Sequence, residues 1–72
     1  SMSDRFTADD ERFYVTDIGG ALSVFDARSG KLSWRYARAY TPEGEGLLYG
    51  PMTASGDYLL GNAVDGLYAL RR

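Results

Sequence analysis

The 72-residue sequence contains neither cysteine nor histidine. Without cysteine it can form no disulfide, so one domain with a small apolar core has to be stable without a covalent cross-link. The absence of both residue types argues against a structural zinc site. Any catalysis would have to use carboxylates, lysine, tyrosine or hydroxyl groups. We therefore expect a protein that is not an enzyme and that binds no cofactor or metal.

Long apolar runs are also missing, which predicts that the chain does not insert into a membrane. The first residues lack the basic head and apolar stretch of a signal peptide. We interpret Ser1 and Met2 as a remnant of tag cleavage. The net charge of −2 and the isoelectric point near 4.8 argue against a nucleic-acid partner.

The composition indicates an ordered β-protein. Hydrophobic residues make up 44% of the chain and aromatic residues 14%, more than disordered segments contain. Residues 21–25 and 32–36 have the β-branched and aromatic character of strands. Between them, Asp26 can accept hydrogen bonds from the amides that follow it, and Gly30 can adopt the positive φ that closes a turn. This segment therefore predicts a hairpin, with Trp34 placed to pack in a pocket.

The hairpin resembles the tryptophan-docking repeat of quinoprotein-type (PQQ-like) β-propellers, whose pattern is Ala-x-Asp-x-x-Thr-Gly-Lys-x-x-Trp. The residues that match the pattern or replace a member of it are Val24 for Ala, Asp26, Ser29 for Thr, Gly30, Lys31 and Trp34. In that family the tryptophan is similar to a peg between neighbouring blades, and the Asp and Thr positions hold the turn. The resemblance implies a structural docking motif here, and a periplasmic or extracytoplasmic location that the residues themselves leave open.

The sequence also contains an internal repeat, because residues 12–25 align with residues 57–70 without a gap. The matched pairs include Phe13 with Tyr58, Val15 with Leu60, and Leu22 with Leu67. A spacing of about 45 residues is typical of four-stranded propeller blades. Gly19-Gly20 and Asp65-Gly66 fall between strands and are expected to form hairpin turns.

These patterns predict an all-β fold of antiparallel four-stranded propeller-blade repeats, with one complete blade and most of a second. The expected strands lie near residues 5–8, 12–17, 21–26 and 32–37 in the first copy and near 51–54, 58–63 and 66–70 in the second. The corresponding segments are a tag remnant (1–2), a first blade repeat (3–38), an inter-blade loop (39–50) and an incomplete second blade repeat (51–72).

The middle strands are apolar on both sides, as in Phe13-Tyr14-Val15 and Tyr58-Leu59-Leu60. A strand that is buried on both faces has this pattern, whereas a half-exposed strand would alternate. Two blades alone leave two outer faces bare and one strand edge open. We therefore expect the chain to associate with itself, with the remaining blades of a parent propeller or with another protein, and a foreign strand to add to the second blade.

The loop over residues 39–50 is the least repeat-like part and could bind a partner on one face of the fold. Its candidate contact residues are Tyr40, Glu43, Glu45 and Tyr49. The alternative is a solvated crossover without a ligand. The acidic run Asp9-Asp10-Glu11 could bind a hard cation, although a solvated turn between two strands explains it as well.

Three functions remain open from the sequence. The first is a non-enzymatic propeller fragment that serves as a scaffold or protein-interaction surface. The second, implied by the resemblance, is a fragment of a quinoprotein dehydrogenase with a quinone cofactor and calcium. The third is an oligomeric lectin-like module that binds sugar through Trp34 and the tyrosines. We expect the first function. Because a fold alone does not specify a function, we keep the other two as alternatives.

Overall fold

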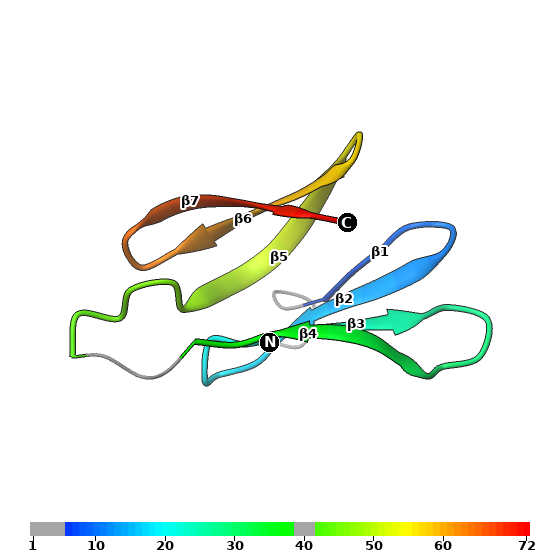
Figure 1. Ribbon diagram of the computed structural model, residues 1–72, viewed down its shortest axis with the longest axis horizontal. Helices are drawn as coiled ribbons and strands as arrows, with labels where there is room; N and C mark the ends of the chain where they lie inside the picture. Colours follow the sequence, from blue (N-terminus) through cyan, green and yellow to red (C-terminus); the bar gives the residue numbers. More distant parts are fainter. Residues whose placement is uncertain (1–5, 39–41) are drawn as a thin grey trace.

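The computed structural model describes residues 6–38 and 42–72 (Figure 1). The described residues form seven β-strands and no helix. The strands are β1 (Phe6–Ala8), β2 (Arg12–Thr16), β3 (Leu22–Asp26), β4 (Leu32–Tyr36), β5 (Leu48–Ser55), β6 (Tyr58–Ala63) and β7 (Gly66–Arg71).

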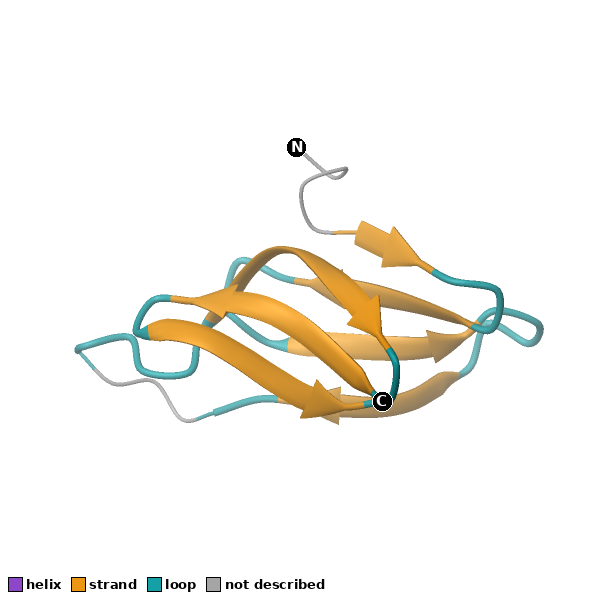
Figure 2. Cartoon of the chain, turned by 90° about the horizontal axis from the view of Figure 1, so that it is seen from above, coloured by secondary structure: helices purple, strands orange, loops and turns teal. Residues whose placement is uncertain are grey.

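The strands form two antiparallel sheets that lie one over the other as two layers (Figures 1 and 2). The first sheet has the order β1-β2-β3-β4 and the second the order β5-β6-β7, so that within each sheet every strand pairs with its neighbours in the chain. The prediction of an all-β fold with four antiparallel strands followed by three is confirmed. Short hairpin connections account for this order, since they join only antiparallel neighbours.

Strand β5 begins at Leu48, three residues before the predicted start at residue 51. Leu48 and Tyr49 already pair with Ala63 and Asn62 of β6, and the register then shifts between Tyr49 and Thr53. Pro51, which lies in this irregular part, cannot donate a backbone hydrogen bond, so it interrupts the pairing without ending the strand. The predicted loop of residues 39–50 is therefore shorter, and its last three residues belong to β5.

The core lies between the two sheets. Its buried apolar side chains are Tyr14, Leu22 and Val24 from the first sheet and Leu48, Met52, Leu59 and Ala63 from the second. A Cβ atom at Gly61 would collide with the sulfur of Met52, so the absence of a side chain there makes room for this methionine. Thr16 is a buried polar residue of β2, and its hydroxyl donates across the two sheets to the carbonyl oxygen of Gly50 in β5 at 2.9 Å. This bond satisfies a polar group that would be costly to bury alone.

In the structure, the two copies of the sequence repeat differ in length at one turn and correspond only when a gap is allowed there. The first sheet pairs Thr16 with Leu22 across residues 17–21, whereas β6 and β7 are joined through residues 64–65 only. The tighter turn shifts the register of β7, and a shift of one residue exchanges the faces of a strand. Leu22 is accordingly fully buried, while Leu67, its predicted equivalent, is 72% exposed.

Candidate functional site

The predicted docking motif forms a closed turn between β3 and β4. One carboxylate oxygen of Asp26 accepts hydrogen bonds from the amides of Arg28 (2.9 Å) and Ser29 (2.8 Å) and from the Ser29 hydroxyl (3.2 Å). The Ser29 and Arg28 amides, which stabilise the charged form, hold the pKa of Asp26 below its ordinary value. The side chain of Asp26 therefore replaces solvent for the amides of the turn.

The remaining motif residues complete this turn. Gly30 adopts a φ of 75° and donates its amide to the carbonyl oxygen of Asp26 at 2.8 Å. The Ser29 hydroxyl oxygen accepts the Lys31 amide at 3.2 Å, and the Lys31 carbonyl accepts the Asp26 amide at 2.8 Å. The motif thus acts on the conformation of the hairpin, which in turn sets the position of β4.

Trp34 lies on the inner face of β4, opposite Val24. Its side chain packs against the core cluster and remains half-buried, because β4 is the edge strand of its sheet. Most of the apolar surface that a tryptophan carries is therefore used in packing within this chain.

The structure does not bring the predicted loop residues together as one site. Tyr40 lies outside the described residues. Glu43 and Glu45 are exposed, whereas Tyr49 belongs to β5 and is 55% exposed on the outer face of its sheet. A hollow of about 230 Å³ at this end is lined by Tyr49 and by neither glutamate. Of the predicted contact residues that the structure describes, Tyr49 alone lines this hollow, and it belongs to a strand instead of a loop.

Apolar side chains are exposed on the outer face of each sheet, the face turned away from the core. On the first sheet, Phe6 is 45% and Leu32 is 55% exposed, and the Phe6 ring packs against Phe13 with 5.6 Å between centroids. On the second sheet, Tyr49 is 55%, Tyr58 is 44% and Leu67 is 72% exposed. The two outer faces therefore carry unburied aromatic and aliphatic groups on opposite sides of the molecule.

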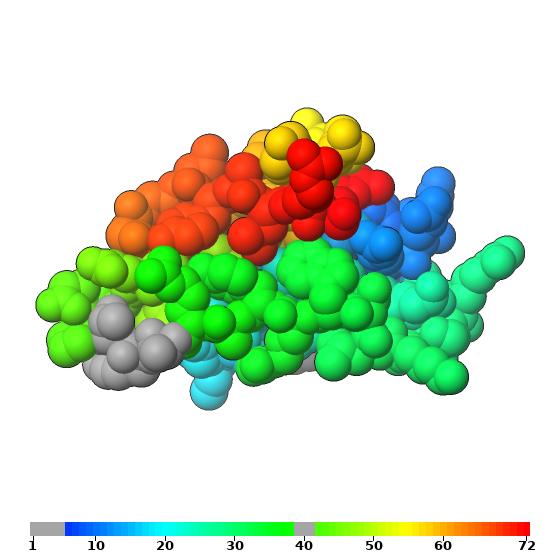
Figure 3. All heavy atoms as spheres, viewed as in Figure 1, coloured from blue at the N-terminus to red at the C-terminus, as the bar shows by residue number. Residues whose placement is uncertain are grey.

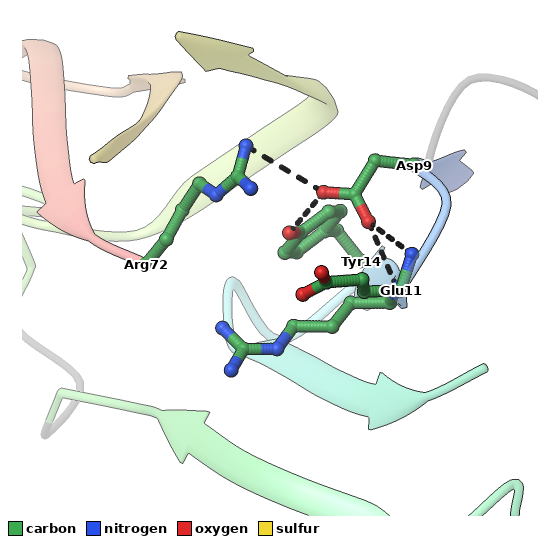
Figure 4. Close-up of polar contacts among 5 residues, drawn as sticks. Asp9, Glu11, Tyr14 and Arg72 are labelled. Atoms are coloured by element: carbon green, nitrogen blue, oxygen red, sulfur yellow. Dashed lines mark hydrogen bonds and ion pairs between the residues drawn. The ribbon is translucent and has the colours of Figure 1, made fainter. Parts of the chain in front are cut away.

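Asp9 forms a polar cluster that the sequence interpretation assigned only to a solvated turn or a cation site (Figure 4). One of its oxygens accepts the amides of Glu11 (2.9 Å) and Arg12 (2.8 Å). The other accepts the hydroxyl of Tyr14 at 2.6 Å and lies 3.6 Å from a guanidinium nitrogen of Arg72. The cluster connects the β1–β2 turn to the residue that follows β7, and so links the two sheets.

The hydrogen bond from the Tyr14 hydroxyl is the largest cause of the lowered pKa of Asp9. Burial, followed by the hydrogen bond to the Asp9 carboxylate, raises the pKa of Tyr14. Both oxygens of Asp9 are thus occupied by protein donors. Among the described residues, no group of three or more acidic side chains is arranged to hold a metal ion.

A second polar cluster links the sheets at the opposite end. Asp65 accepts the amide of Gly46 and the hydroxyl of Tyr68, each at 3.0 Å, and the amide of Gly46 lowers the pKa of this carboxyl. The Arg38 guanidinium donates to the Tyr68 oxygen at 3.3 Å, and the Tyr36 hydroxyl donates to the Gly46 carbonyl at 3.2 Å. The chain segment that crosses between the sheets is therefore held by residues from both.

Comparison of this chain with protein-family models, with curated proteins and with solved structures finds no match. Across the part of the chain that the structure describes, no helix is long and apolar enough to span a membrane.

Proposed function

We propose that this chain is a non-enzymatic β-repeat fragment of the propeller type that serves as a scaffold or protein-interaction surface. Its outer faces are covered by further copies of itself, or by adjoining repeats of the same kind. The observation that carries the proposal is the exposure of large apolar side chains on both outer faces, at 44–72% for Phe6, Leu32, Tyr49, Tyr58 and Leu67. Exposed apolar groups gathered on one face are a common mark of a protein-interaction surface.

The exposed groups resemble those that the two sheets already bury against each other. The core pairs aromatic and aliphatic side chains, with Tyr14, Leu22 and Leu59 each fully buried. Covering Leu67 or Leu32 would remove from water the part of each side chain that is still exposed, 72% and 55% respectively. Each would contribute a part of the about 1.5–3 kcal/mol that full burial of a leucine side chain gives. A small domain without a disulfide therefore gains substantially from covering these faces.

The two sheets of one chain meet through like faces. Tyr14 pairs with Val24 in the first sheet and Leu59 pairs with Leu70 in the second, and all four side chains lie in the core or pack against it. Successive blades of a ring meet through opposite faces, so two arrangements of the outer faces have to be distinguished by experiment: copies that stack in one direction and copies that pair through like faces.

The test is sedimentation equilibrium of the wild type and of two variants, Leu32→Ser on the first outer face and Leu67→Ser on the second. Directional stacking joins the first outer face of one copy to the second outer face of the next. Each variant alone then associates poorly, and an equal mixture forms a dimer, because each copy supplies the face that the other has lost. Pairing of like faces predicts instead that each variant dimerises alone through its intact face.

Ile18→Ser is the matched control, because Ile18 is 86% exposed but lies in the β2–β3 turn and not on a strand of either sheet. It should leave the association constant of the wild type unchanged. A wild-type protein that remains a folded monomer over the whole accessible concentration range would exclude self-association as the function of these faces.

A further inference from the structure

Each of the two sheets ends in two edge strands, which lie on two sides of the molecule. On one side, β1 of the first sheet contacts β5 of the second. On the other side are β4 and β7, and Figure 3 shows residues of β4 (green) and of β7 (orange to red) together on the near face. An edge strand can pair with a further strand through its backbone N–H and C=O groups.

The edges of β1 and β5 are poor templates for a further strand. Strand β1 has only three residues. On β5, the Leu48 amide already donates to the carbonyl oxygen of Gly20 at 2.9 Å, and Pro51 has no N–H to offer. Strands β4 and β7 have five and six residues without proline, and no backbone group of the described residues bonds to their outer edges. The side with β4 and β7 is therefore the open one.

The hydrogen-bond pattern shows which residues of β7 face its open edge. The Arg72 amide donates to the carbonyl oxygen of Asp57 at 2.8 Å, so this pair is hydrogen-bonded. Hydrogen-bonded and non-hydrogen-bonded pairs alternate along an antiparallel ladder. The backbone groups of Leu67, Ala69 and Arg71 accordingly point away from β6, and the side chains of these residues are exposed on the outer face.

The same alternation applies to β4. The Asp17 amide donates to the carbonyl oxygen of Ala21 at 3.0 Å, so the next bonds from β3 to β2 skip Val24, which bonds toward its partner Trp34 on β4. The backbone groups of Arg35 therefore point to the open edge of β4. The side chain of Arg35 is exposed on the outer face, since Trp34 beside it points inward.

The two open edges match each other. Residues directly opposite in an antiparallel pair have their side chains on the same face. On both β4 and β7, the residues whose backbone faces the open edge carry outward side chains, so the inner faces of the two strands remain continuous when they pair. An exact repeat would have placed inward side chains at these positions of β7, as at Val24 of β3. The shifted register of β7 thus produces the match.

We propose that β4 of one copy pairs with β7 of a second copy, and β7 of the first copy with β4 of the second. The two strands run in opposite directions (Figure 1), so a twofold axis along the strands, between the layers, produces both antiparallel pairs at once. Each layer then joins the four strands of one sheet to the three of the other. This contact uses the strand edges and leaves the outer faces free, so it does not depend on the proposed function.

The second copy covers half-buried side chains on the inner faces of β4 and β7. These side chains, which pack against the core of their own chain, are Trp34, Tyr36, Tyr68 and Leu70. When Ala69 lies opposite Arg35, Leu70 lies opposite Trp34 of the other copy. The dimer therefore adds apolar burial to the backbone hydrogen bonds.

Charge favours this register. Arg71 then lies opposite Ser33 of the other copy. A shift of two residues in one direction would place Arg71 opposite Arg35, and a shift in the other direction would place it opposite Lys31. Like charges directly opposite each other destabilise a strand pair.

The first experiment is sedimentation equilibrium of the Leu32→Ser/Leu67→Ser double variant, which has lost an apolar side chain from each outer face. The double variant should still form a dimer. Adding Ala69→Pro removes an N–H from the open edge of β7 without removing a bond to β6, and should raise the dimer dissociation constant about tenfold or more. A double variant that stays monomeric over the whole accessible concentration range would overturn the proposal. A wild type that associates no further than this dimer would count against the outer faces only.

Ala8→Pro in the same background is the matched control. Ala8 is exposed on the edge strand β1, and its N–H points away from β2 because the neighbouring Asp9 amide donates to the Arg12 carbonyl at 3.0 Å. It should leave the dissociation constant unchanged. Equal effects of Ala8→Pro and Ala69→Pro would contradict the assigned edge.

The second experiment identifies the paired strands by cross-linking, since the chain has no cysteine of its own. Arg35→Cys and Ala69→Cys are made separately in the double variant. Opposite residues of a hydrogen-bonded pair have Cα atoms about 5.5 Å apart, a distance that a disulfide spans. An equal mixture should form mixed disulfide dimers faster than either variant forms its own. Faster cross-linking of Ala69→Cys alone, or no excess of mixed dimers, would overturn the proposal, and this test still decides if Ala69→Pro does not fold.

Discussion

Leu22→Ala and Leu67→Ala form a matched pair of substitutions that tests the register of β7. The repeat in the sequence aligns these two leucines, so an exact repeat would give both substitutions the same cost. In the structure, Leu22 is fully buried beneath the second sheet and Leu67 is 72% exposed on the outer face of β7. The two substitutions should therefore differ strongly in their effect on the free energy of unfolding.

The magnitudes follow from burial. Leu22→Ala removes a fully buried side chain and leaves a cavity, for which about 2–5 kcal/mol is typical. Leu67→Ala removes a side chain that is already mostly in water, and its cost should stay within about 0.5 kcal/mol. A domain of this length has a free energy of unfolding of about 4–11 kcal/mol, so the first substitution removes a large fraction of it.

The assay is urea unfolding followed by the fluorescence of Trp34, the only tryptophan of the chain. It should be run in dilute solution, so that association through the outer faces does not contribute. The m-values of the two variants should agree with the wild type, because neither substitution changes the surface exposed on unfolding by much. A cost above about 1 kcal/mol for Leu67→Ala, or below about 1 kcal/mol for Leu22→Ala, would show that the register of β7 is wrong.

Three further predictions concern the turn, the Asp9 cluster and the docking tryptophan. Gly30→Ala should lower the free energy of unfolding in urea by about 1 kcal/mol, and Gly30→Asn should lower it by less. A Cβ atom at this position meets no atom within 4 Å, so the cost comes from the positive φ alone. Asp9 has a lowered pKa, so its stabilisation is present above about pH 4 and is lost as the pH falls through its folded pKa; in Asp9→Asn the urea midpoint should fall less steeply on acidification. Trp34→Ala should cost about 2–3 kcal/mol by calorimetry, below the value for a fully buried aromatic, and a change under about 0.5 kcal/mol would contradict its packing against the core.

Local patterns were sufficient to predict the strands and the β3–β4 turn. The turn depends on Asp26, Ser29 and Gly30, which lie within five residues of one another and interact through short-range hydrogen bonds. Such bonds are a property of the segment itself and need no distant partner. The start of β5 was missed because Gly50 and Pro51 have the composition of a turn, whereas Leu48 and Tyr49 before them already pair with β6.

The long-range polar clusters could not be predicted in the same way. Asp9 and Arg72 lie at opposite ends of the chain, and their contact exists only because the two sheets pack together. Asp65 and Gly46 are likewise brought together by the crossing segment. The acidic run at residues 9–11 was a visible signal, but nothing in it indicates a tyrosine or an arginine as the partner.

The amino-acid pattern alone determined that this chain forms antiparallel strands joined by tight turns, with apolar groups on both sides of the middle strands. Strand propensity and turn chemistry act over a few residues, so the sequence contains them in full. The tertiary structure alone decided which of two aligned leucines is buried, and that Arg72 lies beside Asp9. The length of one turn shifts a register by a single residue, and that shift exchanges the inner and outer faces of β7.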